Sequence, residues 1–148
     1  MKKQKIYFFL CIAALFLSGI SCNSTEDDVI SYTVSESVRV SGFSLAANDS
    51  VLAHLDTIFF TIDLNKGQIY NADSLPVGTD VSALIANISF DNVAQAKIYM
   101  DKGDPTKNDT IDYIANPTDS IDFTSKVSLE VTAQNGTTVK WYLSLIHI

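Results

Sequence analysis

The sequence predicts an all-β domain built as a sandwich of two sheets. Three observations support this class: apolar and polar residues alternate with a period of two in several segments, an Asn-Gly pair separates the last two of these segments, and no long amphipathic helix competes with them. About seven short strands fit into roughly 105 residues, which is the size and strand spacing of an immunoglobulin-like antiparallel β-sandwich.

The strands follow one another from about residue 38. Clear alternation predicts strands with one wet face at 58–64, 96–100, 127–133 and 139–145. A further strand is expected at 87–90, preceded at 81–86 by either a single helical turn or a loop. In the last strand, "TVKWYLSL", we expect burial of the face that carries Trp141, with its indole at the centre of the core.

Two turns are predicted between these strands. Asn135-Gly136, within "QNGT", accepts the positive φ angles of a type I′ turn and predicts a tight hairpin between the last two strands. Residues 75–79, "LPVGT", combine proline with glycine and predict a second turn.

The N-terminus, "MKKQKIYFFLCIAALFLSGISC", predicts a secretory signal peptide at 1–21. It combines a basic start with an apolar run of 15 residues at 6–20 and small residues before Cys22. The run is shorter than the ~20 residues of a comfortable transmembrane helix. The basic start and the abrupt change to "NSTEDD" argue against a buried core helix.

Cys22 is the predicted lipidation site. "LSGISC" resembles a bacterial lipoprotein box, although Gly19 stands where leucine is usual. This resemblance implies that Cys11 is removed, that Cys22 is acylated and that the protein is anchored to a membrane by lipid, at ~0.8 kcal/mol per buried CH₂. The mature domain then has no thiol and no disulfide, which excludes redox, metal–thiolate and cysteine-nucleophile chemistry.

Residues 22–37 predict a flexible acidic tether that is rich in Ser and Thr. Glu26-Asp27-Asp28 resembles the surface-export signal of Bacteroides-type lipoproteins, which implies an outer-membrane protein at the cell surface; the alternative is its periplasmic face. Loss of the signal peptide leaves 7 basic and 17 acidic residues, a net charge of −10. This charge argues against nucleic acid as a partner, since that needs clustered Lys and Arg.

The chain shows no motif of an enzyme or a metal site. His54 and His147 have no partner at ligand spacing, and there is no G-x-S-x-G, phosphate loop or H-E-x-x-H. Asp101, Asp104 and Asp109 suggest a calcium loop, but the EF-hand spacing is missing and Gly103-Pro105 favours a hairpin loop. We therefore expect no catalytic residue, no metal and no cofactor.

Five Asp-Ser/Thr-aliphatic triplets occur where composition predicts roughly one. They resemble the O-glycan acceptor motif of Bacteroides envelope proteins, which implies possible glycosylation at the hydroxyls of Ser50, Thr57, Ser74, Thr110 and Ser120. The alternative is structural, because Asp and Ser/Thr cap turns before an aliphatic residue opens a strand. Both interpretations place the triplets at exposed strand entries.

A family resemblance covers residues 38–143. "LPVGTDVSALIANISF" and "VTAQNGTTVKWYL" resemble Ig-like or cadherin-like modules of Bacteroides surface lipoproteins. The stretch 41–80 is similar to the N-terminal domain of an uncharacterised lipoprotein family in which a larger C-terminal domain, a β-propeller, follows. This implies a non-catalytic spacer or scaffold. The alternative is a glycan- or protein-binding module, whose exposed aromatic candidates are Phe59, Tyr70, Tyr99 and Tyr113.

The last six residues, "LSLIHI", can be back-translated as CTG-TCT-CTT-ATA-CAC-ATC, which resembles a sequencing adapter. We therefore expect the domain to end at residue 143, with 144–148 a non-native tail that replaces a C-terminal domain. The alternative is a natural last strand, which Leu143 and Leu145 would suit.

Overall fold

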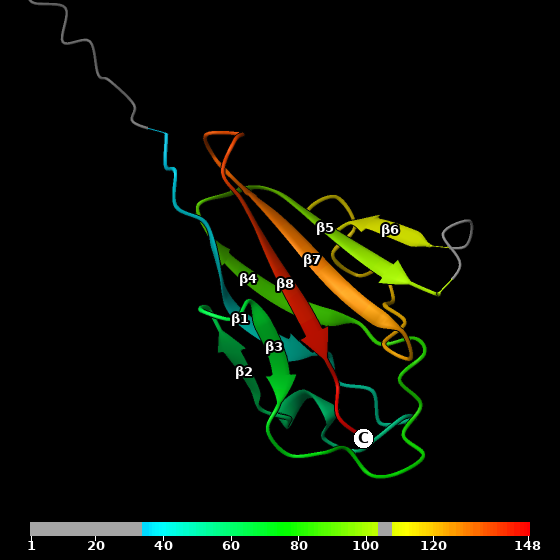
Figure 1. The fold of residues 1–148 in the computed structure, drawn as a ribbon. Coiled ribbons are helices and arrows are strands. Elements are labelled where there is room, and N and C mark those ends of the chain that lie inside the picture. The colour runs from blue at the N-terminus through cyan, green and yellow to red at the C-terminus, as the bar shows by residue number, and fades with distance from the viewer. Residues whose placement is uncertain (1–33, 104–107) are drawn as a thin grey trace, which may run out of the picture. The chain divides into compact units, whose positions relative to one another are not determined.

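The computed structural model describes residues 34–103 and 108–148 (Figure 1). This part of the chain is nearly all β, with eight strands and one short 3-10 helix. In chain order the elements are β1 (Arg39–Leu45), η1 (Leu55–Thr57), β2 (Phe60–Asp63), β3 (Gln68–Asn71), β4 (Ala86–Asp91), β5 (Val93–Asp101), β6 (Asp109–Asp112), β7 (Lys126–Ala133) and β8 (Val139–Leu145).

The strands form two sheets. β1 and β4 pair in a two-stranded sheet, and the other six strands form a second sheet in the order β2-β3-β8-β7-β5-β6. Figure 1 shows β7 and β8 crossing in front of β4, and the buried residues of both sheets form one cluster. The predicted all-β sandwich is confirmed, with eight described strands where about seven were expected.

The strand pairing is antiparallel with one exception. β3 and β8 run parallel, with Ile69 opposite Ser144. Four strands separate β3 and β8 in the sequence, so no hairpin dictates their relative direction. The described residues include no cysteine, so no disulfide joins the two sheets there.

Inward-facing residues of the central strands confirm the predicted alternation. β7 buries every second side chain and leaves those between them partly exposed. β5 follows the same pattern beside it. The buried members are Val127, Leu129, Val131 and Ala133 in β7 and Ala96, Ile98 and Met100 in β5. The predicted strand at 58–64 is shorter than expected. It begins only at Phe60, because Ile58 caps η1, and it ends at Asp63, whose Oδ1 accepts the N–H groups of Asn65 and Lys66 and starts the turn.

β8 buries the opposite face from the one predicted. Trp141 is 55% exposed, so its assignment to the centre of the core is wrong. Tyr142 takes the inward position, opposite Leu129 of β7. Alternation favours the more apolar face of Trp141, Leu143 and Leu145, but the structure buries Tyr142 and Ser144 on the other face. A register change of one residue would move every side chain to the other face.

Two tyrosine hydroxyls join the two-stranded sheet to the rest of the domain. Tyr142 from β8 accepts the backbone N–H of Val40 in β1, at 3.3 Å. Tyr113, which directly follows β6, accepts the N–H of Ile88 at 2.8 Å and donates to the carbonyl of Ala86 at 3.0 Å. Both hydroxyls bind backbone groups of β1 and β4 across the core. In a sandwich without a disulfide, these bonds cross-link the layers.

The predicted turns are present, with one correction. Thr79 donates its N–H to Pro76 O at 3.1 Å, which confirms the turn at 75–79. The hairpin between β7 and β8 is also confirmed, but Ala133 N bonds to Thr138 O and leaves four residues in the loop. Of the Asn-Gly pair only Gly136 has a positive φ, of 73°, so the type I′ assignment is wrong.

Residues 81–85 form a loop rather than a helical turn, and residue 86 is already the first of β4. Leu84 within it makes an isolated antiparallel bridge to Ile121. Phe123 extends the contact by donating its N–H to Val81 O at 2.9 Å. The loop thus leads into β4, the predicted strand at 87–90.

Asn71, at the end of β3, binds the backbone that follows β8. It is 1% exposed. Its Nδ2 donates to His147 O at 2.9 Å and to Asp73 O at 2.7 Å, and its Oδ1 accepts from His147 N at 2.7 Å. Leu75 N also donates to His147 O, at 2.8 Å. Only backbone atoms of residue 147 take part, and the residue itself is exposed.

We expect Tyr113→Phe to destabilise the domain by about 2 kcal/mol and Tyr142→Phe by about 1 kcal/mol. Tyr113 loses two hydrogen bonds to buried backbone, whereas Tyr142 loses one long bond. Urea unfolding followed by the fluorescence of the single tryptophan measures both. Tyr70→Phe is the matched control, expected near zero; equal losses in all three variants contradict the cross-link.

We expect Asn71→Ala to lower the free energy of unfolding by about 2–3 kcal/mol, because it removes three hydrogen bonds and leaves buried backbone groups unpaired. His147→Ala keeps the same backbone contacts and should change it by less than about 0.5 kcal/mol. The same urea experiment compares them. A His147→Ala loss as large as that of Asn71→Ala would show that the imidazole matters.

Candidate functional site

Side chains of β5, β7 and β8 that point away from the core cover the outer face of the six-stranded sheet. The strand registers place Glu130 opposite Lys97 on one side and opposite Trp141 on the other. Tyr99 lies in the next row, opposite Ser128. We name Tyr99, Glu130 and Trp141 the outer-face cluster. The β7–β8 hairpin and β5, which lies far from it in sequence, thus bring two aromatic rings and one carboxylate together.

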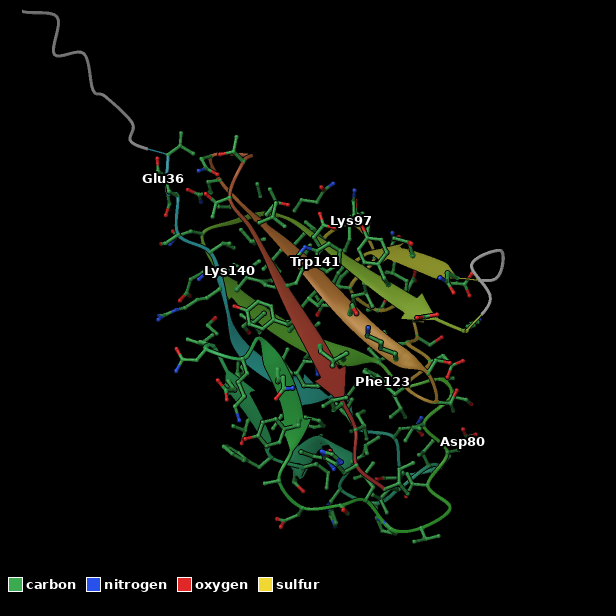
Figure 2. The ribbon with its side chains drawn as sticks, in the orientation of Figure 1. Glu36, Asp80, Lys97, Phe123, Lys140 and Trp141 are labelled. Atoms are coloured by element: carbon green, nitrogen blue, oxygen red, sulfur yellow. The ribbon has the colours of Figure 1, made fainter. Side chains whose placement is uncertain are left out.

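Two contacts hold the outer-face cluster together. The Tyr99 hydroxyl donates to Glu130 Oε2 at 2.9 Å. The rings of Tyr99 and Trp141 have centroids 5.4 Å apart and planes inclined by 32°, within the range of favourable aromatic pairs. Figure 2 shows Trp141 on β8 and Lys97 on β5. The cluster therefore presents an aromatic surface to solvent, in which Trp141 is exposed and Tyr99 half-buried.

The electrostatics of the cluster keep the Tyr99 hydroxyl protonated. Desolvation raises the pKa of Tyr99 above its ordinary value, and the hydrogen bond to Glu130 and the charge of that carboxylate raise it further. At neutral pH the phenol is a hydrogen-bond donor and not a base. The group can bind a polar ligand, but it contains no nucleophile paired with a general base.

A hollow of about 290 Å³ opens beside Trp141, where the β2–β3 turn meets β8. Its lining combines indole, ammonium and amide groups from Leu64, Asn65, Lys66, Gly67, Lys140, Trp141 and Tyr142. Gly67 has a φ of 62°, and a Cβ there would lie 2.6 Å from Trp141 O. Only glycine allows this close approach of the turn to β8.

The family comparison matches residues 33–144 to the N-terminal domain of a domain of unknown function, DUF6242. The chain belongs to the DUF6242 N-terminal domain family. No curated protein and no solved structure matches the chain. The match covers the whole sandwich up to the penultimate residue of β8.

In this DUF6242 domain the five predicted O-glycosylation residues are all exposed. Thr110 lies in β6 and Thr57 ends η1, whereas the other three lie in loops. The aliphatic residue that follows is buried in three triplets, those of Leu75, Ile111 and Ile121. This geometry suits both the acceptor and the turn-capping interpretation. Glycosylation of Ser50, Thr57, Ser74, Thr110 or Ser120 stays a prediction.

The proposed aromatic platforms separate into different roles. Phe59 is 73% exposed beside the start of β2, and Tyr70 lies half-buried on β3. Tyr113 is buried and binds β4 through its hydroxyl, so its selection as an exposed platform is wrong. Trp141 was missed because its strand face was assigned inward. Its neighbour Tyr142 shows the correct face: the Tyr142 hydroxyl bonds to Val40 in the core, so Trp141 must point to the other side of the strand.

The remaining predicted positions are placed as follows. His54 is exposed in a connection with a φ of 62°, as expected. Asp101 ends β5 and Asp109 begins β6, so these carboxylates flank the predicted hairpin; Asp104 lies outside the described residues. Asp109 forms an ion pair with Lys102 at 2.7 Å. The described residues contain no group of three His, Cys, Asp or Glu side chains arranged to hold a metal ion.

The predicted signal peptide at 1–21, Cys22 and the acidic cluster at 26–28 lie outside the described residues. Lipidation and export therefore stay predictions. Of the predicted tether, residues 34–37 are described, and Ser35 O accepts the N–H of Asn135 at 3.2 Å. Within the described ranges, no helix has the length and apolar character that crossing a membrane requires.

Proposed function

We propose that this domain is a non-catalytic spacer in an outer-membrane lipoprotein, which holds a following C-terminal domain away from the membrane. The observation that carries the proposal is the path of the chain. Ser35 bonds to the β7–β8 turn at one end of the sandwich, and β8 leaves that turn and runs to the other end (Figure 1). β8 runs between these ends for seven residues, about 20 Å.

Three further observations support a spacer. The name of the family describes an N-terminal domain, which supports a further domain after it. The N-terminal sequence carries the signal-peptide pattern and Cys22 at the position of a lipoprotein cysteine. The outer-face cluster offers binding groups without a nucleophile and base. We place the protein at the cell surface because of Glu26-Asp27-Asp28, with the periplasmic face as the alternative.

Fluorescence transfer from the domain to a membrane dye tests the spacer. Thr137→Cys labels the entry end and Val77→Cys, at a position 96% exposed, labels the exit end. When Cys22 is acylated, the introduced cysteine is the accessible thiol of each variant on vesicles. We expect stronger transfer from position 137 than from position 77, because the entry end lies nearer the membrane.

Two outcomes decide this test. Equal transfer from both positions, or stronger transfer from position 77, contradicts a spacer that stands away from the membrane. Cys22→Ala is the control for anchoring, since it removes the acylated side chain and should abolish transfer from both positions. Intact mass of the labelled protein verifies lipidation independently.

The second candidate function is binding of a saccharide on the outer face of the six-stranded sheet. The observation that favours it is the exposed Trp141 ring, which contacts Tyr99 and borders the hollow with Lys66 and Lys140. Aromatic rings pack against the apolar faces of sugars, and the ammonium and amide groups suit hydroxyl or carboxylate substituents.

A glycan array probed with the full chain tests this second function. We expect Trp141→Ala to lower the signal of any reproducible hit at least about tenfold, because it removes the main contact surface. Val77→Ala, which changes an exposed apolar residue at the far end of the sandwich, should leave it unchanged. No reproducible hit, or hits that survive Trp141→Ala, would rule out this face as the saccharide site.

A further inference from the structure

A second hollow lies next to the hollow beside Trp141, which we now call the first hollow. It has a volume of about 480 Å³ and is lined by residues at the start of β1, at the β4–β5 connection and at the start of β8. Leu64 and Lys140 line both hollows, so the two are neighbours on the surface. Together they reach the size typical of small-molecule sites, about 300–1,000 Å³.

The short pairing of β3 with β8 leaves this side of the sandwich open. β3 pairs with β8 only from Leu143 onward, so the earlier residues of β8 have no strand on that side. Leu143 turns its N–H toward the β2–β3 turn and donates to Gly67 O. Trp141, which precedes it on the same edge, turns its N–H the same way, and none of the described residues accepts it. The start of β8 therefore offers the first hollow a backbone donor beside the indole ring.

Cations gather at the two hollows. The chain as a whole is strongly acidic, yet half of the Lys and Arg residues in the described part of the chain line these hollows. Lys66 lies at the first hollow, Arg39 at the second, and Lys140 between them on β8 beside Trp141 (Figure 2). They come from the β2–β3 turn, β1 and β8, so the fold brings together cations that are distant in sequence.

These cations keep donors for a ligand. Lys140 takes part in none of the ion pairs of the described residues. Lys66 reaches Asp63 only at 3.9 Å, so its exposed ammonium group is weakly paired. Arg39 donates its Nε–H to Asp91 at 2.6 Å, and this bond orients the guanidinium group while both terminal nitrogens keep their N–H groups. The two hollows therefore present oriented positive groups with unused donors.

The carboxylates of the chain leave room for an anionic ligand at this place. Glu130 belongs to β7, on the other side of β8 from the β2–β3 turn, and already accepts the Tyr99 hydroxyl. Asp91, which lines the second hollow, is paired with Arg39. Carboxylates elsewhere act through solvent, where charge interactions are screened over about 8 Å at physiological ionic strength. Cations that touch the ligand therefore outweigh them.

We propose that the two hollows form one site for an acidic oligosaccharide. Trp141 packs against a sugar ring in the first hollow, and the amides of Asn65 and Asn92 bind hydroxyl groups. Lys140 and Arg39 bind the carboxylate or sulfate group of a neighbouring unit through charge-assisted hydrogen bonds. This inference rests on the saccharide function proposed above and deepens it, because it names the class of ligand and adds a second subsite.

The test is a glycan array that pairs each acidic oligosaccharide with its neutral counterpart. Uronic acid chains are paired with their methyl esters, and sulfated chains with their desulfated forms. The full chain is applied in detergent micelles at physiological salt. We expect the acidic member of a pair to bind at least about tenfold more strongly than the neutral member. The two kinds of pair show whether a carboxylate or a sulfate group is bound.

Charge variants locate the site, with the strongest acidic hit titrated against the fluorescence of Trp141, the single tryptophan. We expect Lys140→Gln to weaken its binding about tenfold. Lys126→Gln is the matched control, because it removes the same charge at an exposed position outside both hollows, and it should bind as the unaltered chain does. Urea unfolding verifies that each variant is folded.

A double variant tests the second hollow. Arg39→Gln combined with Asp91→Asn removes the guanidinium group without changing the net charge of the hollow. We expect this variant to weaken the binding of the oligosaccharide about fivefold and to leave that of its single acidic unit unchanged, because only the longer ligand reaches Arg39. Unchanged binding of both ligands would exclude the second subsite.

Three further outcomes overturn the proposal. Equal binding of acidic and neutral partners excludes an acidic ligand but leaves the saccharide function standing. A loss in Lys126→Gln as large as that in Lys140→Gln shows a general effect of charge and not a site at the hollows. The absence of any reproducible hit on the array overturns the saccharide function and this inference together.

Discussion

The attachment of the two-stranded sheet is the constraint on which the rest of the sandwich depends. Two strands alone are only marginally stable in water, so β1 and β4 need support from the six-stranded sheet. The shared core provides most of it. The hydroxyls of Tyr113 and Tyr142 add bonds that also define position, because each reaches a particular backbone group of β1 or β4.

This constraint also shapes the outer surface. Because Tyr142 must point inward to reach Val40, its neighbour Trp141 points outward. Trp141 then meets Tyr99 across β7, and Glu130 between them accepts the phenol hydrogen bond. The candidate saccharide surface is therefore a consequence of how the sheets are joined. Ser144 follows the same register into the interior, although its hydroxyl finds no hydrogen-bond partner among the described residues.

The same joining reaches both strands of the two-stranded sheet. Tyr113 binds backbone groups of Ile88 and Ala86 in β4, and Tyr142 accepts the N–H of Val40 in β1. A spacer needs only a rigid path from one end to the other, which β8 and the Asn71 contacts provide.

The sequence by itself determined the all-β class, the hairpin before β8, the turn at 75–79 and the alternation of β7, because each depends on local periodicity or on turn residues. Only the tertiary structure decided which face of β8 is buried, that Tyr113 enters the core, and that Asn71 binds the backbone of residue 147. The local pattern of β8 favours the face that carries Trp141, Leu143 and Leu145, yet the buried residues are Tyr142 and Ser144 on the other face. The register between strands and the partners of buried polar groups depend on residues that are distant in sequence. A local pattern therefore cannot decide them.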